Sequence, residues 1–147
     1  MIVAVLNTNV VASGFAGLAR RDSTPGELLR RWRAGGFLLV VSDPIPQELA
    51  RTLRNPYFAS RSSATEIEAA MVELRADALL QSLTTHVAGE ATHAQDDQIL
   101  ATALSAQAPY LVTGDKPLLV RGHYQWTRLL SPREFLSVLE NKALSWQ

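Results

Sequence analysis

Polar side chains that could bind a metal ion follow predicted strands or begin the helices after them. This set comprises Asn7, Asn9, Glu48, Asp96, Asp97 and Asp115. Ligands of open parallel sheets bind beyond the carboxyl ends of the strands, so we expect the set to converge. The carboxylates of Glu48, Asp97 and Asp115 would repel one another there unless they shared a cation. Oxygen ligands suit Mg²⁺ or Mn²⁺, and such a site is typical of phosphodiester hydrolysis.

Each carboxylate also has a structural interpretation. Asp97 is a favoured helix N-cap, Asp115 can be a turn residue, and Glu48 alone is typical of an exposed helix face. The metal hypothesis therefore depends on their convergence. Asn9 and Thr113 are each expected either to hydrogen-bond the acids or only to end a strand or turn.

Residue content excludes or disfavours several other chemistries. The chain has no cysteine, which excludes disulfides, thiolate catalysis and cysteine-bound zinc or iron–sulfur clusters. The histidines lack metal-ligand spacing and are expected to be surface or hydrogen-bonded residues; they are His86, His93 and His123. Residues 13–17 lack the lysine and the spacing of a phosphate-binding loop.

The composition is that of one globular domain without a strong electrostatic field. Of the 147 residues, 47% are hydrophobic, and 14 basic residues balance 14 acidic ones. This balance gives no support for tight, nonspecific binding of nucleic acid. Several arginines cluster in residues 20–33, where a solvated helix face is favoured over a phosphate-binding patch. No apolar run approaches the roughly 20 residues of a membrane span, so we expect a cytoplasmic protein.

Apolar runs and capping patterns predict the elements that position the polar set. Strands are predicted at residues 2–6, 37–41, 110–113 and 127–130, with a weak strand at 83–87. Capping boxes predict helix starts at Thr24, Ser63 and Ser131. Further helices are expected over residues 45–53 and from Asp96 or Asp97 to Ala106, and residues 7–9 are expected to form a loop.

Continuous apolar strands that alternate with helices favour a mostly parallel sheet covered on both faces. The predicted fold class is therefore α/β, a three-layer α/β/α sandwich formed by one domain over residues 1–147.

In these motifs the chain resembles the PIN-domain family of ribonucleases over nearly its whole length. Residues 2–10 resemble the family's opening strand and its D-T-N motif, and residues 46–49 resemble the helix that carries its next acid. Residues 97–103 and 111–115 are similar to the third and fourth acidic motifs, and residues 130–136 to the usual C-terminal close.

The resemblance implies a five-stranded parallel sheet and Mg²⁺- or Mn²⁺-dependent cleavage of RNA. It implies catalytic and metal-binding roles for Asn7, Glu48, Asp97 and Asp115, and supporting roles for Asn9, Asp96 and Thr113. It also implies a homodimer and, if the protein is the toxin of a prokaryotic toxin–antitoxin pair, a small antitoxin that covers the site.

One position departs from the family pattern, because Asn7 stands where the family has aspartate. An asparagine keeps a carbonyl oxygen but loses the negative charge, so we expect weaker metal binding and weaker water activation. Either Asn7 is an inactivating substitution or the natural protein is impaired. The main alternative is a non-catalytic PIN-like module that binds RNA or a protein.

Two other α/β families are disfavoured. A receiver domain needs an aspartate after its third strand, and residues 44–76 contain none. A phosphatase of the haloacid-dehalogenase type needs an aspartate nucleophile in the first motif, where this chain has Asn7.

Overall fold

A six-stranded sheet organises the protein, which a computed structural model describes over residues 1–145, with side chains described through residue 142. The strands are β1 (Val3–Leu6), β2 (Leu38–Asp43), β3 (Leu79–Ser82), β4 (Tyr110–Val112), β5 (His123–Tyr124) and β6 (Thr127–Leu130). Their order in the sheet is β3-β2-β1-β4-β6-β5. Every pairing is parallel except that of β5 with β6. The short antiparallel strand β5 is an addition to the five parallel strands predicted.

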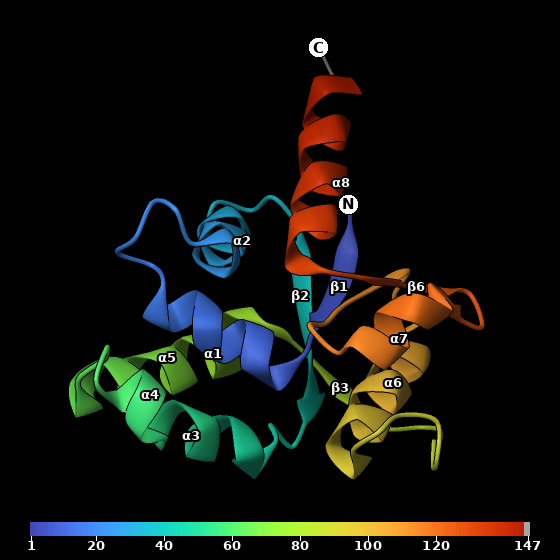
Figure 1. The fold of residues 1–147 in the computed structure, drawn as a ribbon, viewed down its shortest axis with the longest axis horizontal. Helices are drawn as coiled ribbons and strands as arrows, with labels where there is room; N and C mark the ends of the chain where they lie inside the picture. Colours follow the sequence, from blue (N-terminus) through green and yellow to red (C-terminus); the bar gives the residue numbers. More distant parts are fainter. Residues whose placement is uncertain (146–147) are drawn as a thin grey trace.

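Helices cover both faces of the sheet, which confirms the predicted three-layer fold (Figure 1). They are α1 (Thr8–Ala16), α2 (Thr24–Arg33), α3 (Gln47–Arg54), α4 (Pro56–Ala59), α5 (Ala64–Asp77), α6 (Ala94–Ala106), α7 (Lys116–Arg121) and α8 (Pro132–Ser145). Successive strand residues point to opposite faces. Accordingly, Ala4 and Leu6 join the core under α1, α2, α3, α5 and α8, whereas Val5 joins the core under α6 and α7.

Helix α1 begins directly after β1, so the prediction of a loop at residues 7–9 is wrong. Val10 and Val11 are buried in the core, and their burial outweighs the polar local sequence. Gly14 lets α1 pack closely on α2, because a Cβ at this position would collide with the side chain of Leu29.

Two boundaries next to the polar set also differ from those predicted. Helix α5 ends at Asp77, and β3 follows at once as Leu79–Ser82 rather than residues 83–87. Helix α6 begins at Ala94 with His93 in the N-cap position, so its aspartates lie inside the first turn instead of capping it.

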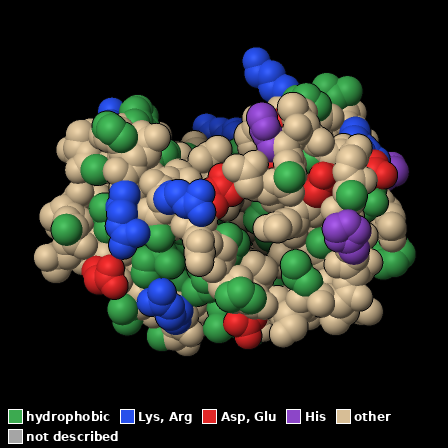
Figure 2. All heavy atoms as spheres, turned by 90° about the horizontal axis from the view of Figure 1, so that it is seen from below, with side chains coloured by type: hydrophobic (Ala, Val, Ile, Leu, Met, Phe, Trp, Pro, Cys, Tyr) green, Lys and Arg blue, Asp and Glu red, His purple; other side chains and the backbone are tan. Residues whose placement is uncertain are grey.

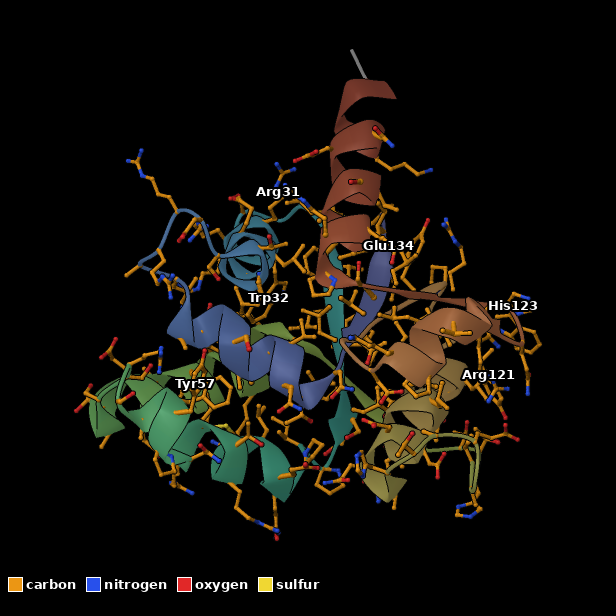
Figure 3. The ribbon with its side chains drawn as sticks, viewed as in Figure 1. Arg31, Trp32, Tyr57, Arg121, His123 and Glu134 are labelled. Atoms are coloured by element: carbon orange, nitrogen blue, oxygen red, sulfur yellow. The ribbon has the colours of Figure 1, made fainter. Side chains whose placement is uncertain are left out.

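Two of the three predicted capping boxes form. Ser63 pairs with Glu66 at the start of α5, and Ser131 pairs with Glu134 at the start of α8. Glu134 is labelled in Figure 3. The box predicted at Thr24 does not form, because the Ser23 hydroxyl caps α2 by accepting a hydrogen bond from the Gly26 N–H.

Candidate functional site

The carboxyl ends of β1 and β4 lie side by side and bring Asn7 next to Thr113. Leu6 is paired with Val112, and the Asn7 N–H donates to the Val112 carbonyl at 2.9 Å. The side-chain amide of Asn7 donates to the Thr113 hydroxyl at 3.2 Å. Both residues are buried, and Thr113 is 0% exposed. The register of the sheet therefore fixes this pair.

Helix α6 adds a carboxylate to this pair. Asn7 Nδ2 also donates to Oδ1 of Asp96 at 3.0 Å, and the Asp115 N–H donates to the Thr113 hydroxyl at 3.0 Å. We refer to Asn7, Asp96, Thr113 and Asp115 as the polar cluster. It joins the ends of two strands to the first turn of α6.

Asn7 is the N-cap residue of α1, but its side chain makes no capping hydrogen bond. An asparagine in this position ordinarily accepts a bond from the helix backbone. Here the amide is turned across the sheet edge toward Asp96 instead. Asn9, which was predicted to support the site, is exposed and makes no hydrogen bond with its side chain in the described part of the chain.

The two aspartates of α6 have different partners. The Asp97 carboxylate accepts three backbone hydrogen bonds, from Gly89 at 3.0 Å, Glu90 at 3.0 Å and Ala91 at 2.8 Å. Successive helix residues point about 100° apart, so when Asp96 faces β1, Asp97 faces the preceding loop. The structure thus brings Asp96, and not Asp97, to Asn7.

Asp115 does two things at the end of β4. Its Oδ2 accepts a hydrogen bond from the Leu118 N–H at 3.0 Å and caps α7. Its backbone N–H joins it to the Thr113 hydroxyl. Asp115 therefore has a structural role, as the N-cap of α7, and is also a member of the polar cluster.

Glu48 lies on α3 and is held by a neighbour of the polar cluster rather than by its members. The Gln95 amide donates to Glu48 Oε1 at 2.6 Å. Glu48 makes no hydrogen bond to Asn7, Asp96 or Asp115 among the described side chains. Gln95 carries no catalytic signature in the sequence, and only its place immediately before Asp96 points to it.

A polar groove opens beside this bond. Figure 2 shows the molecule from below, the side on which α3 and α6 lie in Figure 1. The groove has a volume of about 610 Å³. Its lining residues come from α3, α6 and the residues flanking α3: Pro46, Gln47, Glu48, Arg51, Thr52, Asn55, Gln95 and Gln98. We call it the α3–α6 groove.

The polar cluster offers oxygen atoms, which are the donors that suit a hard cation. One oxygen each of Asn7, Asp96 and Asp115 accepts no hydrogen bond within the described part of the chain, and oxygen donors are those that Mg²⁺ and Mn²⁺ prefer. Among the described side chains, however, no three His, Cys, Asp or Glu residues lie close enough to hold a metal ion. Asn7 supplies an oxygen but no charge, and its amide N–H already donates to one oxygen of Asp96.

The histidines lie outside the polar cluster. His86, His93 and His123 are all exposed, and His93 stands at the N-cap of α6. No helix within residues 1–145 combines the length and apolar character needed to cross a membrane.

Comparison with models of protein families identifies a domain in this chain. A family model described as PIN domain matches residues 3–117, a range that runs from β1 into α7 and contains the whole polar cluster. A search of curated proteins finds no match.

Proposed function

The chain belongs to the PIN-domain family, and on this premise we propose that it is a divalent-metal-dependent endoribonuclease whose activity is weakened or abolished by Asn7. The observation that carries the proposal is the 3.0 Å contact between Asn7 Nδ2 and Asp96 Oδ1. It sets the position of the family's first acid directly against a carboxylate. An aspartate in that position would create the paired acids that a hard cation binds.

We assign the metal-binding role to Asp96 and Asp115, together with the residue at position 7 and, after release from Gln95, Glu48. A divalent cation bound there would polarise a phosphate and lower the pKa of a bound water. The Thr113 hydroxyl orients position 7 and the backbone of Asp115. Asp97 holds the loop at residues 89–91 and so fixes the start of α6. The sequence suggested a metal-binding role for Asp97 and a supporting role for Asp96, and this proposal exchanges the two roles.

The experiment is RNA cleavage by the parent protein and by Asn7→Asp, each with Mg²⁺, Mn²⁺ or EDTA. Losing a charged stabiliser at such a site costs about two orders of magnitude in rate, so Asn7→Asp should gain at least roughly a hundredfold. The gain should vanish in EDTA. If Asn7→Asp is as inert as the parent with both metals and several RNAs, the nuclease proposal fails.

Finer proposals follow from the family resemblance. We propose that the substrate is RNA with accessible single strands, that the protein acts in the cytoplasm as a homodimer, and that it is the toxin of a pair with a small antitoxin. Growth inhibition by Asn7→Asp, relieved by a co-expressed partner, would support the toxin role. Light scattering of the purified protein tests the dimer.

A second candidate function is a non-catalytic module that binds RNA or a protein. The observation in its favour is that the Asn7 amide donates a hydrogen bond to Asp96 Oδ1, so this oxygen has a partner without a cation. RNA binding that persists in the parent and in Asn7→Asp, with no cleavage by either, would favour this function.

A further inference from the structure

The α3–α6 groove lies directly beside the polar cluster. Its walls meet at the Gln95–Glu48 hydrogen bond of 2.6 Å, and Gln95 immediately precedes Asp96. No member of the polar cluster lines the groove itself, but Gln95 and Asp96 both lie in the first turn of α6, so the groove and the cluster share this turn. Apart from Pro46, every lining residue is polar, so the groove suits a hydrated, polar ligand rather than an apolar one.

Arg51 is the cation of this groove. It is exposed and has neither an ion pair nor a hydrogen bond through its side chain within the part of the chain that the structure describes. A guanidinium in this state can form a bidentate contact with a phosphate without first breaking another interaction. Its charge is therefore available to a ligand.

Four of the five arginines of residues 20–33 form ion pairs, whereas the exposed Arg21 forms none in the described part of the chain. Arg33 binds Glu73 at 2.6 Å, and Arg30 and Arg31 both face Glu27 at 3.5 and 3.7 Å. These ion pairs agree with the expectation of a solvated helix face at residues 20–33. A polyanion would have to compete with these carboxylates there, whereas at Arg51 it would not.

Uncharged lining residues add hydrogen-bonding groups to the α3–α6 groove. Gln98 and Asn55 lie in the same groove as Arg51 and carry side-chain amides. The Asn55 oxygen accepts a hydrogen bond from the Tyr57 N–H, so Asn55 offers its amide N–H groups, whereas Gln98 offers donors and an acceptor. Such groups can hydrogen-bond the base edges that a single strand exposes and that a duplex hides. One cation with several amides also suits a short stretch of single strand better than duplex DNA, whose tight binding requires many phosphate contacts.

We propose that the α3–α6 groove binds the single-stranded RNA substrate, with Arg51 on a backbone phosphate and Asn55 and Gln98 against the bases. This inference rests on the proposed function and adds the path of the substrate strand. Arg51 is a positioning residue: it holds the strand so that a phosphodiester lies beside Asp96.

The test is fluorescence anisotropy with a labelled single-stranded RNA in EDTA, using the parent protein, Arg51→Ala and Arg51→Lys. We expect Arg51→Ala to weaken binding at least about fivefold and to reduce the slope of log K against log salt by about one. Arg51→Lys, which keeps the charge, should retain most of the affinity. Circular dichroism confirms that each variant is folded.

Arg75→Ala is the matched control. Arg75 is exposed, has no partner for its side chain in the described part of the chain, and lies in the last turn of α5, which leads into the start of β3. It is not among the residues that line the groove. Equal RNA affinities for Arg51→Ala and Arg75→Ala would overturn the groove, as would an Arg51-dependent affinity for an oligoglutamate peptide or duplex DNA that exceeds that for RNA.

Cleavage separates this inference from the proposed function. If Asn7→Asp cleaves RNA equally well with and without Arg51→Ala, the groove is wrong and the nuclease proposal stands. If binding depends on Arg51 while Asn7→Asp is inert, the groove stands and the nuclease proposal fails.

Discussion

Asn7 Nδ2 lies 3.0 Å from Asp96 Oδ1, although the two residues are 89 positions apart in the chain. The uncharged amide donates a hydrogen bond to the carboxylate. A carboxylate in place of the amide would set two negative charges at this distance, and such a pair is stable only with a shared proton or metal ion. One side chain thus decides whether this edge of the sheet needs a cation.

The first prediction concerns stability. Without metal, Asn7→Asp should unfold more easily than the parent by about 1–3 kcal/mol, because a hydrogen bond is lost and like charges are brought together. Mn²⁺ at 100 times its Kd should restore about 2.7 kcal/mol, or roughly 5–10 °C in Tm. Thermal unfolding with Mn²⁺ and with EDTA measures both effects.

Asn9→Asp is the control for this prediction. It adds the same charge two residues later, at an exposed position of the same helix. Its Tm should not depend on Mn²⁺. A Mn²⁺ response that is equal in the two variants would show that the cation binds without the contact to Asp96.

The second prediction separates the two aspartates of α6. In the Asn7→Asp background, Asp96→Asn should abolish Mn²⁺ binding measured by calorimetry. Asp97→Asn should leave one binding event but increase hydrogen exchange at residues 89–91, because the carboxylate that accepts three backbone N–H groups is weakened. The reverse pattern would return the metal-binding role to Asp97.

The layers of the fold were predictable from the sequence because each central strand is a continuous apolar run. Strand β1 buries Ala4 and Leu6 on one face and Val5 on the other, so helices must cover both faces. Helix α1 was not predictable, because its first residues are polar and its stability comes from burying Val10 and Val11 against elements distant in sequence. The residues around α1 alone do not reveal those long-range contacts.

The polar cluster was predictable only in part, because the sequence pattern also selected Asn9, Glu48 and Asp97, which make no side-chain hydrogen bond to its members. Sequence pattern selected Asn7, Thr113 and Asp115, which the sheet brings together. The choice between Asp96 and Asp97 depends on the residue at which α6 begins, and that start is fixed by bonds from a loop to Asp97. A shift of one residue rotates a helix position by about 100°, so the start of α6 decides which of the two aspartates faces Asn7.

The third prediction is a pH dependence at the start of α8. Hydrogen bonds of the Glu134 carboxylate, first with the Ser131 backbone N–H and second with the Ser131 side chain, lower the pKa of Glu134. A lowered pKa in the folded protein means that the stabilisation is present above the unfolded-state pKa and is lost as the pH falls through the folded-state pKa. Glu134→Gln should therefore reduce Tm at neutral pH, and the difference from the parent should shrink to zero in acid.

Glu68→Gln is the control for the capping box. Glu68 is exposed on α5 and makes no hydrogen bond or ion pair through its carboxylate in the described part of the chain. Its Tm should follow that of the parent at every pH. A Glu134→Gln difference that stays constant from neutral to acid pH would contradict a role for the ionised carboxylate.

The last prediction concerns Thr113, whose hydroxyl joins position 7 to Asp115. It is 0% exposed and accepts hydrogen bonds from the Asn7 amide at 3.2 Å and from the Asp115 N–H at 3.0 Å. Thr113→Val keeps the shape but removes the acceptor, so both donors lose a partner and the free energy of unfolding should fall by about 1–3 kcal/mol. Thr113→Ser keeps the hydroxyl and should lose only the smaller contribution of one buried methyl group, about 1 kcal/mol. Urea unfolding ranks the two variants, and a Thr113→Val protein as stable as the parent would show that the hydroxyl contributes nothing to the polar cluster. In the Asn7→Asp background the same substitution should lower the RNA cleavage rate more than Thr113→Ser does, because the oxygen that orients position 7 is then absent.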